Sequence, residues 1–238
     1  MVHTADREVC RQMEITLKRV SKQYKEQAAI GNLSLSLREG EIACVLGPSG
    51  AGKTTLLQIL AGLTSYEGEV LGRPERISYV FQSARLFPNL TVRQNLEFVL
   101  PKSEHKHIAS ALAEVGLAGK ENAYPHALSG GQAQRVAFLR AFLYPSELIL
   151  MDEPFSSLDT ALKIRLVELF VRLWNKERRT VVFVTHDAEE AAMMSQRTLF
   201  LRDGKLIADF SDDSPLPRQY GAVSDYKSRI LARILDEE

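Results

Sequence analysis

Residues 42–61 read IACVLGPSGAGKTTLLQILA, and this stretch decides the fold. Ile42–Leu46 is short and wholly apolar, as expected for a β-strand that is covered on both faces. Residues 47–52 are rich in glycine and predict a tight loop, and Lys53–Ala61 has the apolar spacing of a helix that ends before Gly62. A buried strand, a loop and a helix in this order predict an α/β protein.

The loop fits the pattern G-x-x-x-x-G-K-[ST], in which glycines allow backbone N–H groups to turn inward around a polyanion. The helix that follows adds its partial positive charge. Lys53 can reach the β and γ phosphates of a nucleotide, and the Thr54 hydroxyl can ligate Mg²⁺. A plain glycine turn with an incidental lysine is the alternative, and the strand–loop–helix context disfavours it. We therefore expect ATP to be bound by Gly47, Pro48, Ser49, Gly50, Ala51, Gly52, Lys53, Thr54 and Thr55.

Two carboxylates follow a second apolar run, Leu148–Met151. In open parallel sheets, ligands bind outside the carboxyl ends of the strands. We expect Asp152 to hold Mg²⁺, and Glu153, which points differently because strand side chains alternate, to orient the attacking water or accept its proton. An ordinary acidic strand end is the alternative, and the phosphate loop weakens it.

A second glycine pair occurs at 128–132, which reads LSGGQ before a predicted helix over Gln132–Tyr144. Ser129 can cap that helix, and Gly130 and Gly131 free backbone N–H groups, so the segment has the properties of an anion site. Taken alone, a normal helix cap explains it equally well, because a chain with one nucleotide loop does not need a second phosphate site.

The remaining pattern alternates between strands and helices. Helical periods dominate from Val92 to Tyr144, where prolines punctuate them, and this predicts a helical subdomain inserted into an α/β core. The tail predicts a short amphipathic helix at Tyr226–Leu235, packed on the core or on a partner. Further strands are expected at Ile15–Val20, Leu33–Leu37, Ile77–Phe81, Val181–Val184, Thr198–Leu201 and Lys205–Ala208, and further helices at Val92–Val99, Lys106–Val115, Ala161–Lys176 and Ala188–Met194.

Composition excludes several classes of protein. The chain has 30 Lys+Arg and 30 Asp+Glu, so its net charge of zero argues against a nucleic-acid partner that is bound through a broad basic surface. The apolar runs fall far below the ~18 residues that span a bilayer. The first residues carry acids and lack the apolar core of a secretory signal. Cys10 and Cys44 form no CxxC pair, which favours a reduced cytosolic protein with Cys44 as a small core residue.

Taken together, LSGGQ, the phosphate loop and LILMDEP at 148–154 resemble the ATP-binding-cassette (ABC) ATPases, from about Leu17 to Ala208. The resemblance implies an α/β fold with a P-loop NTPase (RecA-like) core, a mixed sheet, a small antiparallel β region and an inserted helical subdomain. The ATPase domain is then 14–210, with its core at 14–86 and 146–210 and the helical subdomain at about 87–145, followed by a tail at 211–238.

The resemblance also assigns roles to single residues. Tyr24 matches the aromatic residue that stacks on adenine, although a surface or packing tyrosine stays a possible reading. Gln82 matches a glutamine that senses Mg²⁺ and the membrane partner. Asp159, in the segment Ser156–Asp159, matches the loop that connects two sites across a dimer. His186 matches the switch histidine that contacts the γ-phosphate. Family cassettes dimerise head to tail, so Ser129, Gly130, Gly131 and Gln132 would close on the ATP of a second copy.

The resemblance also implies which process ATP hydrolysis powers. With every hydrolytic element present, we expect an active ATPase that powers solute import through a separate transmembrane permease at the cytoplasmic face of the bacterial cell membrane, with a solute-binding protein as an indirect partner. Gln82–Val92 resembles the segment that contacts the permease, and the whole pattern is closest to importers of nitrate, sulfonates, taurine and thiamine precursors. The alternatives are an exporter or lipoprotein-release cassette, and a soluble non-transport ABC ATPase. An ordinary P-loop kinase or GTPase is disfavoured by LSGGQ and His186.

Overall fold

A six-stranded sheet forms the centre of the protein, for which a computed structural model describes residues 14–25, 27–156 and 158–235. Its strand order is β5-β6-β7-β3-β8-β9, and all neighbouring strands are parallel except β8 and β9. The strands are β3 (Ile42–Leu46), β5 (Ile77–Val80), β6 (Leu148–Asp152), β7 (Thr180–Val184), β8 (Arg197–Arg202) and β9 (Lys205–Ser211). Every residue of β3, β6 and β7 is buried, which explains their unbroken apolar sequences.

A three-stranded antiparallel sheet, in the order β2-β1-β4, covers one side of this core. It consists of β1 (Ile15–Tyr24), β2 (Gln27–Leu37) and β4 (Glu67–Leu71). β4 was not predicted from the sequence, because four of its five residues are exposed and it lacks an apolar alternation. Gly68 has φ 92° and a Cβ there would collide with the backbone oxygen of Arg19, so the β1–β4 pairing requires glycine at this position.

The central sheet separates two apolar layers. On one side, Ala43 and Val45 pack with the small sheet and with helix α1 (Lys53–Leu60). On the other side, Ile42, Cys44 and Leu46 pack with the long helices. Cys44 is a buried core residue, as predicted, and burial raises the pKa of its thiol well above the ordinary range. Cys10 lies outside the described residues.

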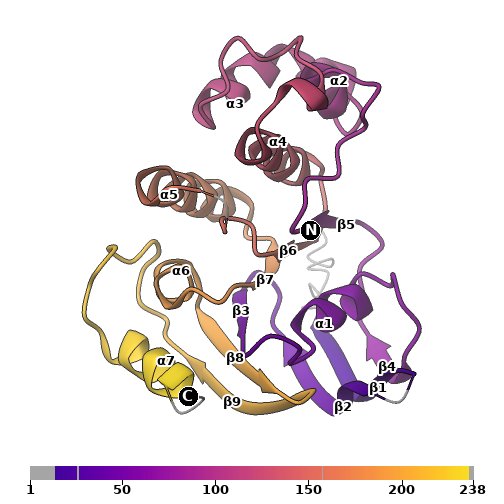
Figure 1. Ribbon diagram of the computed structural model, residues 1–238, viewed down its shortest axis with the longest axis vertical. Coiled ribbons are helices and arrows are strands. Elements are labelled where there is room, and N and C mark those ends of the chain that lie inside the picture. The colour runs from indigo at the N-terminus through magenta and orange to yellow at the C-terminus, as the bar shows by residue number, and fades with distance from the viewer. Residues whose placement is uncertain (1–13, 26, 157, 236–238) are drawn as a thin grey trace, which may run out of the picture.

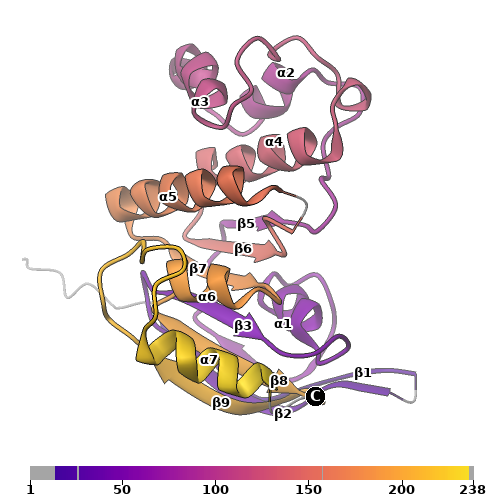
Figure 2. The same cartoon turned by 60° about the vertical axis from the view of Figure 1, so that its left-hand side comes forward.

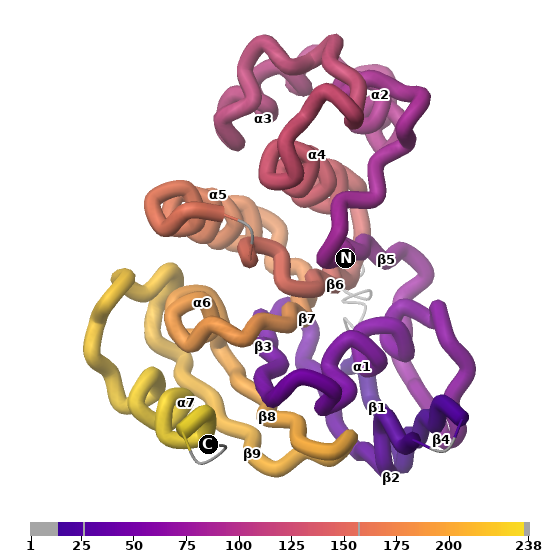
Figure 3. Tube along the Cα trace, in the orientation of Figure 1, coloured from indigo at the N-terminus to yellow at the C-terminus, as the bar shows by residue number. Residues whose placement is uncertain are grey.

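The chain leaves the sheet after β5, passes through a group of helices and returns to it at β6, a path that Figure 3 traces. These helices are α2 (Val92–Glu97), the 3₁₀ turn η1 (Lys102–His107), α3 (Ile108–Glu114), the 3₁₀ turn η2 (Pro125–Ala127) and α4 (Gly130–Leu143). The helix expected from Lys106 begins only at Ile108, because a 3₁₀ turn after Pro101 occupies its first residues. The predicted limits of this helical subdomain, at about 87 and 145, stay a prediction.

Three more helices complete the fold: α5 (Thr160–Glu177), α6 (Ala188–Met194) and α7 (Asp225–Leu235). The tail helix α7 packs on the core, which was one of its two predicted placements, and runs beside β8 and β9 (Figure 2). The hydroxyl of Tyr226 lies 2.8 Å from Ser195 Oγ and 2.6 Å from Thr198 Oγ1, and its ring meets Phe210 edge-on. In the described part of the chain, every helix is too short or too polar to cross a bilayer.

Candidate active site

The phosphate loop connects β3 to α1 at the carboxyl end of the central sheet. Gly52 is the N-cap of α1 in a left-handed conformation, φ 96°, and no side chain caps the helix. The N–H groups of the first turn are therefore left for an anion, as the sequence predicted. Acidic side chains are missing from this first turn, so nothing in it opposes a phosphate.

Two glycines fix the position of this loop against its neighbours. A Cβ at Gly47 (φ 143°) would collide with the backbone oxygen of Leu201 in β8. A Cβ at Gly52 would collide with the backbone oxygen of Ala29 in β2. The loop is thus held between the central sheet and the small sheet, and any other residue at either position would push it out of place.

Lys53 bends back over the loop. Its ammonium group donates to the carbonyl oxygens of Gly47 at 2.6 Å and Pro48 at 2.7 Å. The lysine therefore sits over the concave side of the loop, beside the amide groups of the first turn. Its charge is held where phosphate oxygens would lie.

Thr54 and Asp152 meet next to the lysine, at the places that the sequence assigned to a metal site. Thr54 Oγ1 donates to Asp152 Oδ1 at 3.3 Å, and Asp152 is 6% exposed. Burial raises the pKa of the Asp152 carboxyl, and the neighbouring Glu153 adds to this effect, while Thr54 and Lys53 oppose it. A hydroxyl and a buried carboxylate are oxygen ligands of the kind Mg²⁺ prefers, so this pair fits the metal.

Two other predicted residues, Gln82 and His186, meet at Glu153. Its Oε2 accepts a hydrogen bond from Gln82 Nε2 at 3.1 Å, and its Oε1 lies 3.5 Å from His186 Nδ1. The prediction that strand alternation directs Glu153 was wrong. β6 ends at Asp152, and Glu153 adopts φ 47° while its N–H bonds Val184 O at 3.0 Å. This left-handed backbone conformation, uncommon for a residue other than glycine, turns the carboxylate toward Gln82 and His186.

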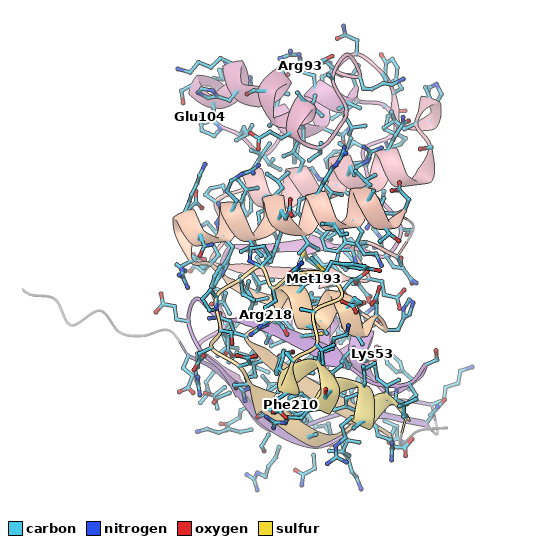
Figure 4. The ribbon with its side chains drawn as sticks, turned by 90° about the vertical axis from the view of Figure 1, so that its left-hand side faces the viewer. Lys53, Arg93, Glu104, Met193, Phe210 and Arg218 are labelled. Atoms are coloured by element: carbon cyan, nitrogen blue, oxygen red, sulfur yellow. The ribbon has the colours of Figure 1, made fainter. Side chains whose placement is uncertain are left out.

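A cavity of about 210 Å³ joins these groups, because the phosphate loop, Lys53, Glu153 and His186 all line it. Ile234 of α7 also lines it, and Figure 4 labels Lys53 beside the end of that helix. The sequence analysis did not assign Ile234 to the site. An isoleucine carries no chemical signal, and only the folding of the tail over β8 and β9 brings it here.

The other predicted residues lie apart from this cavity. Tyr24 is exposed at the end of β1, with its hydroxyl 3.4 Å from Gln58 Oε1 of α1 and the Lys22 ammonium 4.8 Å from the centre of its ring. Asp159 caps α5 by accepting from Leu162 N at 3.0 Å, and Ser157 lies outside the described residues.

Ser129 caps α4 in a capping box with Gln132, as expected, but α4 begins at Gly130, earlier than predicted. Both glycines thus lie in its first turn, with their N–H groups still to be satisfied. Among the described residues, 129–132 are not part of the lining of the phosphate-loop cavity, and α4 belongs to the helical group at the top of Figure 1. One copy of the chain therefore holds the two predicted anion sites at separate places.

Comparison with known proteins gives one consistent answer. The model of the ABC transporter family matches residues 30–156, more than half of the chain. The aliphatic sulfonates import ATP-binding protein SsuB 2 of Streptomyces avermitilis is 39% identical over 231 residues, which cover 92% of this chain and 90% of that protein. SsuB 1 of Pseudomonas syringae pv. tomato is 42% identical over 220 residues, covering 91% and 82%.

Solved structures agree with the sequences. The dimeric post-hydrolysis state of the ATP-binding cassette MJ0796, bound to ADP and Pi, superposes with a TM-score of 0.76 at 32% identity, covering 83% of this chain and 98% of that one. The predicted α/β cassette fold and ATPase activity are thus confirmed. The phosphate loop, the acidic strand end, the LSGGQ segment at 128–132 and these matches together establish that the chain belongs to the ABC transporter family and is one of its ATPases.

Proposed function

We propose that this chain is the ATP-hydrolysing subunit of a solute importer, working as a head-to-tail dimer beneath a separate transmembrane permease. The observation that carries the proposal is the convergence of Gln82 and His186 on Glu153, next to the phosphate loop. The proposed dimer accounts for the separate anion sites, because the first turn of α4 in one copy would face the nucleotide of the other. The solved relatives with this fold are dimeric.

The phosphate loop binds ATP before any chemistry occurs. The first-turn N–H groups of α1 hold phosphate oxygens, and Lys53 exchanges its bonds to Gly47 O and Pro48 O for bonds to the β and γ phosphates. Tyr24 stacks on the adenine from the end of β1. Mg²⁺, when bound, would be held by Thr54 and Asp152 with Gln82 beside them, and would neutralise charge on the phosphates.

Hydrolysis then depends on Glu153 and His186. Glu153 holds the attacking water and receives its proton. His186, whose side chain is 68% exposed, lies next to the Oε1 atom of this carboxylate and contacts the γ-phosphate. The hydrogen bond from Gln82 keeps Glu153 turned toward this position. Phosphoryl transfer requires positioning and charge neutralisation above all, and the chain supplies both from rigid strand ends.

An exposed aromatic patch next to Gln82 is the proposed contact with the permease. Phe87 and Phe98 are exposed, and their ring centroids lie 4.8 Å apart. The guanidinium of Arg140 lies 5.6 Å from the Phe87 ring, and Asn95, fully buried, accepts from Phe87 N and donates to the carbonyl oxygens of Phe87, Leu90 and Thr91. A rigid, exposed aromatic surface of this kind suits the short cytoplasmic helix of a membrane partner.

The import of aliphatic sulfonates is the transport reaction that the related proteins suggest, since both bear that substrate in their names. The test is to co-purify the chain with candidate permeases from the same organism and to measure ATP hydrolysis with a series of solute-loaded binding proteins. Stimulation by alkanesulfonates supports the proposal. Permease-bound enzyme that no solute-loaded binding protein stimulates contradicts the importer assignment, while the ATPase activity itself would still stand.

A further inference from the structure

His186 stands between two residues that a buried polar cluster holds in place. The cluster consists of Lys163, Thr185, Asp187 and Glu190, and we name it the switch clamp. Thr185 Oγ1 donates to Glu190 Oε2 at 2.6 Å and accepts from Asp187 N at 3.0 Å. Asp187 in turn caps α6, accepting from Glu189 N at 2.8 Å. Both backbone neighbours of His186 are therefore fixed, while the imidazole itself is largely exposed.

Lys163, which lies on helix α5, contacts both carboxylates of the switch clamp. Its Nζ lies 2.7 Å from Asp187 Oδ2 and 2.7 Å from Glu190 Oε1. Glu190 is 2% exposed and Lys163 16%. Burial alone would lower the pKa of Lys163, but its hydrogen bonds to both carboxylates raise the pKa above its usual range. Burial alone would raise the pKa of Asp187, but Lys163 and the cap bonds lower it. All of these contacts thus favour a charged Lys163 and Asp187 at neutral pH.

The same lysine belongs to the helix that Asp159 starts. Lys163 N donates to Asp159 O at 2.9 Å, in the first turn of α5, and Asp159 caps that turn. One helical turn therefore connects Asp159, which the family resemblance places at the dimer contact, to the residues on both sides of His186. A displacement of the start of α5 would act directly on Asp187 and Glu190.

We propose that Lys163 is a positioning residue for hydrolysis. Its contacts with Asp187 and Glu190, and through Glu190 with Thr185, hold His186 at the γ-phosphate. Because Lys163 lies in the helical turn that Asp159 caps, a displacement of Asp159 also changes the position of the histidine. The proposal rests on the role of His186 in the proposed function. A buried ion pair that only stabilises the fold is the alternative, and it predicts a loss of stability without a selective loss of turnover.

The test compares Lys163→Met, Lys163→Arg and a matched control, Arg197→Met, in the full chain. Arg197 is also a half-buried cation, 11% exposed, that pairs with two carboxylates, Glu41 and Asp209. Arg197 begins strand β8, where its backbone lies opposite Ala43 near the start of β3. The phosphate loop follows the other end of β3, so Arg197 lies away from the site. Its removal therefore reports the general effect of breaking a buried ion pair away from the site.

We expect Lys163→Met to lower kcat by about tenfold or more while the ATP dissociation constant changes by less than about threefold, because the clamp acts on the reacting state and not on nucleotide binding. Lys163→Arg should recover most of the rate, and Arg197→Met should lower the melting temperature without changing kcat more than about twofold. Equal effects of Lys163→Met and Arg197→Met on kcat, or no effect of Lys163→Met, would overturn the proposal. If Lys163→Met does not fold, Glu190→Gln replaces it with the same expectation.

A double variant separates this proposal from the function on which it rests. His186→Ala should abolish most turnover, and adding Lys163→Met to it should cause little further loss, because both changes remove the same contribution. Additive losses of turnover in the double variant would overturn the positioning role of Lys163 and leave the role of His186 unaffected. Near-normal turnover in His186→Ala would overturn the assigned role of His186, and the Lys163 proposal with it.

Discussion

His186 Nδ1 lies 3.5 Å from Glu153 Oε1, although the two residues follow different strands. β6 and β7 are parallel neighbours, with Asp152 opposite Val184, so their carboxyl ends deliver both side chains to the same edge of the sheet. The left-handed backbone of Glu153 then completes the approach. The proposed hydrolytic pair is thus a product of strand register and of one residue in a left-handed backbone conformation.

Glu153→Gln should retain ATP binding and lose turnover by about 10²-fold or more, because the amide keeps the shape of the side chain but cannot accept the proton. Single-turnover hydrolysis and equilibrium binding of labelled ATP measure the two effects. Glu147→Gln is the matched control, since Glu147 precedes β6 at its other end and pairs with exposed Arg76. Near-normal hydrolysis by Glu153→Gln would remove Glu153 from the catalytic role.

Ser129→Arg should leave ATP binding by the single chain intact and prevent ATP-induced dimerisation, because a large cation would occupy the first turn of α4. Sedimentation velocity with ATP in the Glu153→Gln background detects the dimer. Thr91→Arg is the control, as Thr91 and Gln94 form the same capping box at α2 that Ser129 and Gln132 form at α4. Both variants lose a cap of about 1 kcal/mol, so a full dimer in Ser129→Arg would show that α4 does not face the second copy.

Asp152→Asn should raise the melting temperature of the nucleotide-free protein at neutral pH while abolishing Mg²⁺-dependent hydrolysis. Burial raises the pKa of Asp152 in the folded state, so its ionisation costs stability as the pH rises above the ordinary carboxyl pKa of about 4. The gain from asparagine should therefore grow as the pH rises from about 4 toward neutrality, level off once Asp152 is fully ionised in the folded state, and vanish at lower pH.

Thermal melts of wild type and Asp152→Asn across this pH range provide the measurement, with Asp213→Asn, at an exposed position, as the control. A gain that is constant with pH would rule out ionisation of Asp152 as its cause. A loss of stability at neutral pH would show that the bond from Thr54 outweighs burial.

Tyr226→Phe should destabilise the fold by about 1–2 kcal/mol, because the hydroxyl is buried between Ser195 and Thr198 and its removal leaves both without this partner. The melting temperature should fall by about 2–8 °C. Tyr220→Phe, on the exposed part of the tail, should have no effect. Equal melting temperatures for wild type and Tyr226→Phe would mean that α7 does not anchor the tail in solution.

The sequence predicted the strands that are buried on both faces, because a short run of consecutive apolar residues is typical of such a strand. It also predicted candidate site residues from their places in the chain, because Lys53 follows β3 through the phosphate loop and Asp152 and Glu153 come at the end of β6. β4 could not be predicted, because hydrogen bonding to β1, and not the burial of apolar side chains, makes it a strand. Three further features could not be predicted for a related reason, because each depends on contacts between segments far apart in the sequence. They are the left-handed backbone of Glu153, the position of Ile234 in the lining of the cavity, and the switch clamp.

Transport by the reconstituted complex tests the central claim most directly. The permease and this chain are placed in lipid vesicles with the chain on the inner side, ATP is enclosed, and a labelled alkanesulfonate with its binding protein is added outside. We predict ATP-dependent accumulation of the solute inside with the wild-type chain and none with Glu153→Gln. Outward movement of the solute, or equal uptake with both chains, would contradict the account.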